Sequence, residues 1–384
     1  MDRMDVVLPP AAIGILGGGQ LGRMLALEAR RSGYRVVVLT DEPPGSPAGQ
    51  LAHVEINGSY TDAALLDRFL AEVEVVTAEF ENIPDACLQA VAERRPLRPG
   101  RRAIFTTQHR EREKLFLRDQ GIACAPFRIV ENEAQLQAAV EELGRPCVIK
   151  TAAFGYDGKG QCKVTAETDL TQAWRAFEGA HAVVEAWVPF VKEVSVVGAR
   201  GMDGSMAVHG CVENEHADHI LDVTIAPARV EPATADQALA LWRAVAEGLD
   251  YVGTMAVEMF VTADGGVMVN EIAPRPHNSG HHSIESCETN QFHQQMRVIC
   301  GLPLGEARLH TPAVMVNLLG DVWPTEDQAP DWSAVLEHPR AKLHLYGKEC
   351  ARRKRKMGHF TVLGSDVKQA LREAREIQAR LGRR

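Results

Sequence analysis

VEMFVTADGGVMVNE, residues 257–271, consists of two apolar and β-branched runs on either side of Asp264 and Gly265. An Asp-Gly pair in this setting predicts a β-hairpin with a two-residue turn. Counting outward from that turn places Glu258 directly opposite Glu271, on one face of the hairpin. The Cβ atoms of facing residues lie about 5 Å apart, so two like charges there are destabilising. The stretch therefore predicts two strands and a pair of facing carboxylates, and this unfavourable placement calls for a functional reason.

A hard divalent cation is the simplest reason, because carboxylate and phosphate oxygens are the ligands that such ions prefer. Zinc is disfavoured, since no Cys or His lies at ligand spacing beside Glu258 or Glu271. Two alternatives stay open. A register slipped at Gly266 would leave one glutamate solvated, and paired catalytic carboxylates would suit a glycosidase.

Residues 270–282, NEIAPRPHNSGHH, follow as a polar loop that two prolines restrict. Most of its remaining side chains are hydrogen-bonding groups. His277, His281 and His282 would suit zinc, but no acid at metal-ligand spacing accompanies them. We interpret the loop as the junction between a metal-bound phosphate and an acceptor substrate.

A glycine-rich stretch, KTAAFGYDGKGQ at residues 150–161, lies between two predicted strands. It is not a Walker A loop, because Lys159 is followed by Gly160 and no helix begins there. A glycine-rich hairpin that carries a lysine is suited to closing over phosphates, and Lys150 would add a second cation. The alternative is a mobile surface hairpin with a solvated lysine.

GGGQLG at residues 17–22 sits at a predicted strand-to-helix turn, and Asp41 follows after the next strand. This pattern matches the dinucleotide-binding fingerprint, in which glycines let a pyrophosphate approach a helix N-terminus. Another phosphate-bearing ligand, or tight strand–helix packing, explains the glycines equally well. Residues 11–100 alternate short strands and helices, which predicts a parallel sheet with a ligand site at the carboxyl ends of its strands.

The composition is that of a globular protein with 384 residues, 45% of them hydrophobic, and a net charge of −9. This charge argues against broad binding to nucleic acids or anionic membranes. No signal-peptide pattern and no apolar run long enough to span a membrane is expected. The eight cysteines are scattered without a CxxC motif, which is typical of free thiols in a reducing compartment. We expect a cytoplasmic protein of two or three domains.

Together these motifs resemble those of the ATP-grasp family, and within it the 5-(carboxyamino)imidazole ribonucleotide synthases. The similar segments run nearly end to end: GGGQLGRM, AEFENIP, GYDGKGQ, EAWVPFVKEVSVV, NEIAPRPHNSGHH, NLLGD, HLYGKE and RKMGH. The resemblance implies a fold of α/β and α+β parts, with a two-part ATP-grasp domain that clamps a nucleotide between antiparallel sheets. The implied parts are a biotin-carboxylase-like N-terminal parallel-sheet domain (residues 1–107), the ATP-grasp domain (108–305, with lobes of about 115–185 and 186–305) and a small C-terminal domain (306–384).

The same resemblance implies an ATP-dependent carbon–nitrogen ligase of de novo purine biosynthesis. The implied reaction is the ATP- and bicarbonate-dependent carboxylation of 5-aminoimidazole ribonucleotide on its exocyclic amine, through carboxyphosphate, to give 5-(carboxyamino)imidazole ribonucleotide, ADP and phosphate. ATP is then a co-substrate and Mg²⁺ the metal. The implied partners are small molecules, without nucleic acid or membrane, and the chain is expected to form a homodimer.

By this resemblance the first glycine loop meets a nucleotide substrate rather than NAD. Glu258 and Glu271 carry over as magnesium ligands, in agreement with the hairpin count. The expected ATP contacts are Arg110, Lys150, Gly155, Tyr156, Asp157, Gly158, Lys159, Gly160, Gln161, Glu185, Ala186, Trp187, Val188, Glu193, His216, Asn270 and Glu271. The expected acceptor contacts are Gly19, Gln20, Leu21, Glu79, Asn82, Asn278 and Ser279. The candidate catalytic residues are Asp157, Lys159, Arg275 and His277, of which Asp157 and His277 are candidates for proton handling.

The run Arg352–Lys356 gathers five adjacent cations in a chain of negative net charge, which invites an anionic partner. A solvated loop and a nucleic-acid patch are the alternatives. Because the run is short, lacks aromatic residues and leads into RKMGH, we expect Lys348 and Arg355 to bind the 5′-phosphate of the ribonucleotide. Two positions depart from the family pattern: His282 replaces a tryptophan and Lys354 a glycine.

Three rival functions remain open. A NAD-dependent dehydrogenase explains residues 17–22 and Asp41, but not the lysine-bearing loop, the carboxylate pair or the histidine loop. A non-catalytic binding protein rests only on the basic run. Another ATP-grasp ligase, such as a formyltransferase or a biotin-dependent carboxylase subunit, is the competitor within the class.

Overall fold

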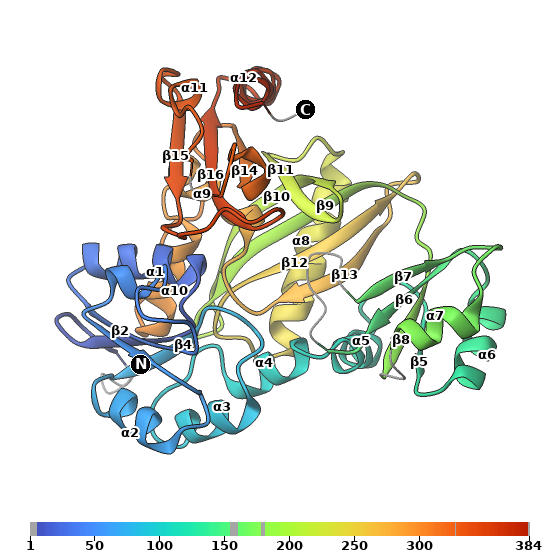
Figure 1. The fold of residues 1–384 in the computed structure, drawn as a ribbon, viewed down its shortest axis with the longest axis horizontal. Coiled ribbons are helices and arrows are strands. Elements are labelled where there is room, and N and C mark those ends of the chain that lie inside the picture. The colour runs from blue at the N-terminus through green and yellow to red at the C-terminus, as the bar shows by residue number, and fades with distance from the viewer. Residues whose placement is uncertain (1–5, 154–159, 178–180, 327, 383–384) are drawn as a thin grey trace.

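The computed structural model describes residues 6–153, 160–177, 181–326 and 328–382, which form three sheets and the helices around them (Figure 1). The N-terminal sheet (blue) and the C-terminal strands (red) lie at one end of the molecule, and a small lobe (green) lies at the other. The longest strands, in yellow-green and gold, run between these two ends (Figure 1).

The N-terminal sheet is parallel throughout, as predicted, and helices cover both of its faces. Every residue of its central strand β1 (Ala12–Leu16) is buried, as a strand covered on both faces requires. The alternation of short strands and helices expected for residues 11–100 is confirmed. The sheet order is β3 (Val54–Asn57), β2 (Arg35–Thr40), β1 and β4 (Val75–Ala78), and the helices are α1 (Gln20–Arg31), α2 (Ala63–Ala71) and α3 (Asp85–Ala92).

The small lobe is an antiparallel sheet whose core is closed by two helices. Its strand order is β5 (Phe127–Val130), β8 (Ala182–Ala186), β6 (Cys147–Thr151) and β7 (Gln161–Val164). The helices are α6 (Glu133–Leu143) and α7 (Leu170–Ala176). The lysine-bearing loop joins β6 to β7, so the two strands predicted around it are confirmed.

The large sheet is antiparallel and contains strands from both the predicted ATP-grasp and C-terminal regions. Its order is β13 (Val267–Ala273), β12 (Gly253–Thr262), β9 (Phe190–Arg200), β10 (Met206–Ala217), β11 (Ile220–Ala226), β14 (Ala313–Leu319), β16 (Lys356–Leu363) and β15 (Ala341–Leu345). Backbone pairing between β11 and β14 makes the sheet continuous. The C-terminal strands therefore extend the large sheet, and the division at residue 305 stays a prediction.

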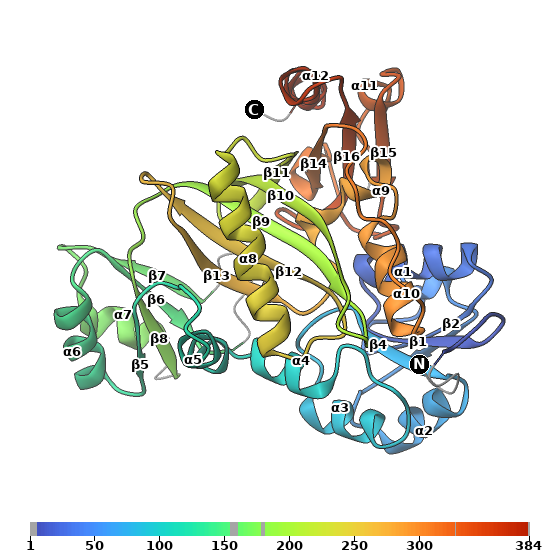
Figure 2. The ribbon, with the colours of Figure 1, turned by 180° about the vertical axis from the view of Figure 1, so that it is seen from behind.

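One long helix, α8 (Pro232–Gly248), crosses a face of the large sheet (Figure 2). Its Trp242 is 0% exposed and donates from Nε1 to Met255 O at 3.3 Å. At the far end of the sheet, α11 (Ser333–Leu336) and α12 (Val367–Arg380) cover β14 and β16. The burial of Trp242 makes α8 the main apolar support of the strands that carry the site.

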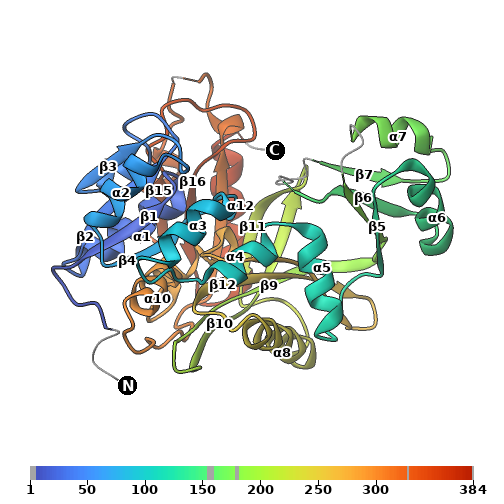
Figure 3. The same cartoon turned by 90° about the horizontal axis from the view of Figure 1, so that it is seen from below.

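The N-terminal sheet is joined to the rest of the chain by α10 (Gln291–Ile299), which packs beside α1 (Figure 3). Phe292 and Met296 belong to the same buried cluster as Leu25 of α1. Gln295 Nε2 donates to Thr77 Oγ1 at 2.9 Å, at the end of β4. A helix that follows the ATP-grasp strands in sequence therefore completes the core of the first sheet.

Two helices, α4 and α5, link the N-terminal sheet to the small lobe. α4 (Arg101–Thr107) ends before His109, whose extended backbone caps α5 (Arg110–Asp119). α4 begins with the exposed Arg101 and Arg102 and buries Ile104. The break brings the first residue of α5, Arg110, to the edge of the small lobe, where its N–H donates to Ala152 O.

The β12–β13 hairpin pairs Glu258 with Glu271 as predicted, but through a different register. The turn holds three residues rather than two, 263–265, with Gly265 at φ +84°. That turn alone would shift the pairing by one residue. The extra residue Asn270 forms a β-bulge that shifts it back.

The bulge also decides which side chains reach the site. Asn270 and Glu271 both line the cavity described below, whereas Val269 and Ile272 on either side lie in the core. In an unbroken strand, neighbouring side chains point to opposite faces. Two consecutive polar residues can share one face here only because the strand contains the bulge.

Trp242→Ala is expected to lower the free energy of unfolding by about 3–5 kcal/mol, because a buried aromatic side chain leaves a cavity when it is removed. Denaturant unfolding followed by far-ultraviolet circular dichroism measures this. Leu336→Ala is the control, since Leu336 is 68% exposed and its loss should cost less than about 0.5 kcal/mol. Equal costs for the two variants would contradict the role given to α8.

Candidate functional site

A cavity of about 1290 Å³ is lined by residues of the small and large sheets and by residues that follow the strands of the N-terminal sheet. Pockets for one small ligand span roughly 300–1,000 Å³, so this cavity has room for two. The predicted ATP contacts that line it are Arg110, Lys150, Gly160, Gln161, Glu185, Ala186, Trp187, Val188, Glu193, His216, Asn270 and Glu271. The other predicted site residues that line it are Gly19, Gln20, Leu21, Glu79, Glu258, Arg275, His277, Asn278, Lys348 and Arg355.

Some predicted residues are placed elsewhere or not described. Asn82 and Ser279 are not among the lining residues. Gly155–Lys159, which include the candidate catalytic residues Asp157 and Lys159, lie outside the described residues.

The sequence analysis missed several residues that complete the site, namely Lys114, Glu81, Lys163, Phe190, Phe260 and Lys356. The sequence spacing could have identified one of them, because Lys114 lies one helical turn after Arg110, on the same face of α5. The others become neighbours of the site only through strand pairing and loop packing.

At the N-terminal end of the cavity, the carboxylate of Glu79 occupies the position where a dinucleotide fold holds phosphate. Gly19 N donates to Glu79 Oε1 at 2.7 Å, and Gly22 N donates to Oε2 at 3.2 Å. A Cβ atom at Gly19 would lie 2.5 Å from Glu79 Oε1, so the approach requires glycine. The protein's own anion thus uses the donors at the start of α1, which argues against a pyrophosphate there.

Burial raises the pKa of Glu79 above its ordinary value, while the two backbone N–H donors oppose that rise. Two residues further on, Glu81 forms a bidentate ion pair with Arg275, with Nε to Oε2 at 2.5 Å and Nη2 to Oε1 at 3.0 Å. Burial lowers the pKa of Arg275, but Glu81 raises it by more. The pKa is therefore raised overall, and the guanidinium stays charged. The acceptor end of the cavity is therefore joined to the histidine loop.

Next along the loop, His277 Nε2 lies 3.1 Å from Glu258 Oε1. Burial, Arg275 and Lys356 hold the pKa of His277 well below 6.5. Because a neutral imidazole carries no charge, this approach to Glu258 is a polar contact rather than an ion pair.

One of the two facing carboxylates, Glu258, is strongly perturbed. Burial is the main cause that raises the pKa of Glu258 from 4.5 to about 7, and Glu271 and Glu193 add to it while His216 opposes it. His216 Nδ1 itself lies 3.2 Å from Glu193 Oε2. A facing pair of carboxylates with oxygen donors only fits Mg²⁺ better than a softer metal.

At the other end, Glu185 gathers three cations although only 3% of it is exposed. Its Oε2 lies 3.1 Å from Lys150 Nζ and 3.2 Å from Lys114 Nζ, and its Oε1 lies 3.9 Å from an Arg110 nitrogen. Burial pushes the pKa of Glu185 upward, but these cations hold it at about 2. Arg110 also contacts Glu271 Oε2 at 3.4 Å, which ties the cation cluster to the carboxylate pair.

Aromatic side chains line the cavity beside this cluster. Phe190 and Phe260 stack with ring centroids 4.6 Å apart, and Trp187 lies 6.5 Å from Phe190. Lys163 Nζ lies 3.8 Å from the centroid of the Trp187 ring. A flat apolar wall next to a cluster of cations is suited to a heteroaromatic base that carries phosphates.

The basic run contributes a second group of cations. Lys348, Arg355 and Lys356 line the cavity. Lys348 Nζ donates to Lys356 O at 2.9 Å, and burial together with Arg355 lowers the pKa of Lys348 to about 8. Cations crowded in this way favour an anionic ligand, which would relieve their mutual repulsion.

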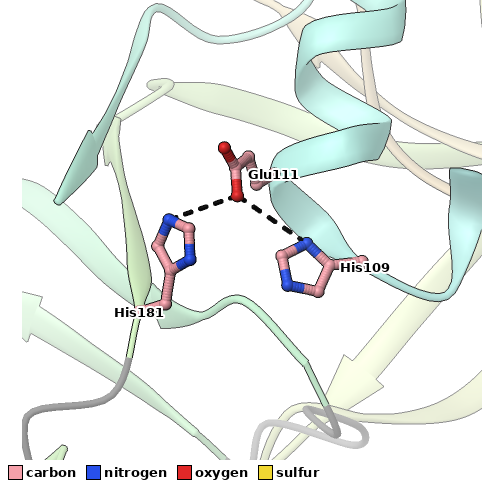
Figure 4. Close-up of side chains that lie close together, drawn as sticks. All are labelled: His109, Glu111 and His181. Atoms are coloured by element: carbon pink, nitrogen blue, oxygen red, sulfur yellow. Dashed lines mark ion pairs between the residues drawn. The ribbon is translucent and has the colours of Figure 1, made fainter. Parts of the chain in front are cut away.

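A separate group, His109, Glu111 and His181, lies outside the cavity lining (Figure 4). Figure 4 shows both imidazoles turned toward one carboxylate oxygen of Glu111, at 3.2 Å from His181 Nε2 and 4.0 Å from His109 Nδ1. Burial and the neighbouring Arg112 lower the pKa of His109. The guanidinium of Arg112 repels a metal cation. We therefore interpret the group as polar contacts that hold α5 against the start of β8.

Comparison with known proteins agrees with this geometry. Residues 11–108 match the ribonucleotide synthetase preATP-grasp domain, residues 115–292 the ATP-grasp domain, and residues 313–373 the phosphoribosylaminoimidazole carboxylase C-terminal domain. The chain is 43% identical to N5-carboxyaminoimidazole ribonucleotide synthase of Bacillus subtilis, over 94% of this chain and 93% of that protein. The chain belongs to the N5-carboxyaminoimidazole ribonucleotide synthase family. It is an ATP-grasp ligase.

Solved structures of this family have the same fold. An ADP complex of an N5-carboxyaminoimidazole ribonucleotide synthetase superposes with a TM-score of 0.91 at 43% identity, over 98% of both chains. A synthase from Aspergillus clavatus in complex with ADP and 5-aminoimidazole ribonucleotide superposes with a TM-score of 0.87 at 32% identity, over 97% of this chain and 98% of that one. The expected ATP-grasp fold with a parallel-sheet N-terminal domain is confirmed. None of the described helices is long and apolar enough to cross a membrane.

Glu258→Gln is expected to make the stability of the metal-free protein less dependent on pH. The pKa of Glu258 rises from 4.5 to about 7 on folding, so the folded state holds its proton more tightly than the unfolded state. Its contribution is therefore present below about pH 4.5 and is lost as pH rises toward 7. The measurement is denaturant unfolding at pH 5 and pH 8, where the variant should gain stability over wild type at pH 8.

The control is Glu376→Gln, because the Glu376 side chain is 67% exposed. It should leave the pH dependence unchanged. If Glu258→Gln behaved like this control, the carboxylate would be solvated rather than held against Glu271.

Proposed function

We propose that the chain carboxylates the exocyclic amine of 5-aminoimidazole ribonucleotide with bicarbonate at the expense of ATP, and releases ADP and phosphate. The observation that carries the proposal is a cavity with cations at both ends and a carboxylate pair between them. One end suits a triphosphate and the other a monophosphate ester, which are the charged groups of these two substrates. Membership of the family supports the same reaction.

At the ATP end, we propose that Lys150 and Arg110 contact the phosphates while Trp187 and Phe190 pack against the adenine. Glu185 holds the two cations in place before the nucleotide binds, because its pKa of about 2 keeps it ionised. Asn270 Oδ1 lies 3.4 Å from Lys150 Nζ and orients that ammonium group. Positioned charges of this kind account for most of the catalysis of phosphoryl transfer.

Between the two ends, Glu258 and Glu271 are proposed to hold Mg²⁺. When bound, the ion supplies charge neutralisation on the β- and γ-phosphates. Without it, burial and, to a smaller extent, Glu271 keep the pKa of Glu258 raised to about 7. The donors of this chain therefore fit the ion that the family implies.

The chemistry consists of two transfers. An oxygen of bicarbonate attacks the γ-phosphorus, the bond to the bridging oxygen of ADP breaks, and carboxyphosphate forms. Carboxyphosphate releases carbon dioxide and phosphate, and the acceptor amine attacks the carbon and loses a proton. Exclusion of water from the site favours this sequence, because it protects the reactive intermediate from hydrolysis. We propose that Arg275, whose charge is maintained by Glu81, binds the bicarbonate or carboxyphosphate anion.

At the acceptor end, Lys348 and Arg355 are proposed to bind the 5′-phosphate. The glycine loop cannot take this role, because Glu79 already occupies its donors. The ribonucleotide is therefore proposed to lie with its phosphate toward the basic run and with its sugar and base toward residues 19–21 and Glu79. A homodimer and a cytoplasmic location stay predictions from the sequence.

The reaction is tested by measuring ADP release with each substrate omitted in turn. Full turnover is expected only with ATP, bicarbonate and aminoimidazole ribonucleotide together, with isotope from labelled bicarbonate in the product. Glu271→Gln should nearly abolish ADP release while the chain stays folded, since removing one of two facing charges relieves repulsion. Wild-type turnover in this variant, or ADP release independent of the ribonucleotide, would contradict the proposal.

Arg355→Met should raise the Michaelis constant for aminoimidazole ribonucleotide by roughly 10- to 150-fold, since a charge-assisted hydrogen bond contributes about 1.5–3 kcal/mol. The Michaelis constant for ATP should remain nearly unchanged. Arg353→Met is the matched control, because the Arg353 side chain is 81% exposed and pairs with Asp321. If both constants rose together in Arg355→Met, the phosphate would bind elsewhere.

A further inference from the structure

Four buried side chains, those of Thr224, Asn214, Ser195 and Ser279, form a continuous series of hydrogen bonds that crosses the large sheet and ends at His277. We call this series the file. Thr224 Oγ1 donates to Asn214 Oδ1 at 3.0 Å, and Asn214 Nδ2 donates to Ser195 Oγ at 3.0 Å. Ser195 Oγ donates to Ser279 Oγ at 2.7 Å. Ser279 Oγ then lies 2.9 Å from His277 Nδ1.

The members of the file come from neighbouring strands. Thr224 and Asn214 face each other across β11 and β10, and Ser195 on β9 faces Glu258 on β12. Ser279 belongs to the short turn of 3-10 helix at residues 278–280. Thr224, Ser195 and Ser279 are 0% exposed and Asn214 is 5% exposed. Buried polar groups of this kind need partners with fixed hydrogen-bond directions.

Each amide or hydroxyl hydrogen that joins two members of the file can point in only one direction. The amide of Asn214 donates to Ser195, so the Ser195 hydroxyl hydrogen is free to point to Ser279. Ser279 accepts that hydrogen and directs its own toward Nδ1 of His277. The backbone N–H of Ser279 also donates to this Nδ1, at 3.3 Å. A nitrogen that receives two donors cannot carry a hydrogen itself.

We propose that Asn214, Ser195 and Ser279 are positioning residues that lock His277 as the neutral tautomer with hydrogen on Nε2. Nε2, which then carries the hydrogen, lies 3.1 Å from Glu258 Oε1. In the proposed arrangement Nε2 donates to this carboxylate. His277 is therefore a fixed hydrogen-bond donor that orients a metal-ligand carboxylate, and it is not the general base of the reaction.

The backbone of His277 is held by hydrogen bonds that do not involve the file. The position of the ring therefore does not depend on its tautomer. Gln291 Oε1 accepts from His277 N, and Gln291 Nε2 donates to His277 O, both at 2.8 Å. A change in the file therefore leaves the ring in place and alters only which nitrogen carries the hydrogen. The role in metal binding rests on the proposed function, whereas the tautomer does not.

The tautomer is tested in the full-length, metal-free protein labelled with ¹⁵N-histidine, by correlation spectra that separate protonated from unprotonated ring nitrogens. Loss of a signal in His277→Gln assigns the ring. Wild type should show a hydrogen on Nε2 and none on Nδ1. In Asn214→Asp the new carboxylate only accepts, so Ser195 and Ser279 reverse, Nδ1 loses one of its two donors, and the fraction of His277 that carries a hydrogen on Nδ1 should rise. A hydrogen on Nδ1 in wild type, or an unchanged ring in Asn214→Asp, would overturn the proposal.

The consequence for the metal is tested with two matched substitutions. Ser195→Ala breaks the file, whereas Ser286→Ala removes an equally buried hydroxyl that donates to His282 O instead. Ser195→Ala should raise the Mg²⁺ concentration for half-maximal turnover by about 10- to 100-fold, as loss of partners behind a metal ligand does. The Michaelis constant for aminoimidazole ribonucleotide should stay unchanged.

Ser286→Ala should leave the magnesium dependence of turnover unchanged. Equal changes in both serine variants would show a general loss of packing and overturn the metal role. Absence of carboxylation by wild type would contradict the proposed function alone, because the spectrum of His277 is measured without substrates.

Discussion

The repulsion between Glu258 and Glu271 is the constraint on which the rest of the site depends. Two carboxylates that face each other across a hairpin are unfavourable unless their charge is compensated. Arg110 contacts one of them, and His277 Nε2 lies 3.1 Å from the other. These contacts do not compensate fully, because burial, together with Glu271, still raises the pKa of Glu258 to about 7. The folded protein therefore retains a negatively charged site whose charge a bound divalent cation would compensate.

From this pair, polar contacts continue to both ends of the cavity. On one side they pass through Arg110 to Glu185 and its lysines. On the other they pass through the histidine loop to the Arg275–Glu81 ion pair and so to the segment that carries Glu79. Each link joins a different layer of the fold. The two proposed substrate sites are thus held in one rigid polar framework rather than in separate pockets.

Parts of the site were predictable because their signals are local. The glycine loop, the basic run and the Asp-Gly hairpin are each written in fewer than about 20 consecutive residues, and local hydrogen-bonding and turn preferences act over that range. The facing of Glu258 and Glu271 was predicted for an incomplete reason, since a longer turn and a bulge at Asn270 cancel each other. Lys114 was missed because a buried lysine looks like an ordinary surface residue of a charged helix until Glu185 is placed beside it.

The sequence by itself determined the alternation of strands and helices, the polar loops that carry chemistry, and the carboxylate pair, because each depends on turn chemistry or on residue periodicity. Only the tertiary structure decided that Glu79 occupies the donors of the glycine loop, that α10 completes the N-terminal core, and that Thr224, Asn214 and Ser195 form a file to His277. These contacts join residues that are far apart in the chain or on separate strands. Their partners are chosen by sheet order and packing, which no local pattern encodes.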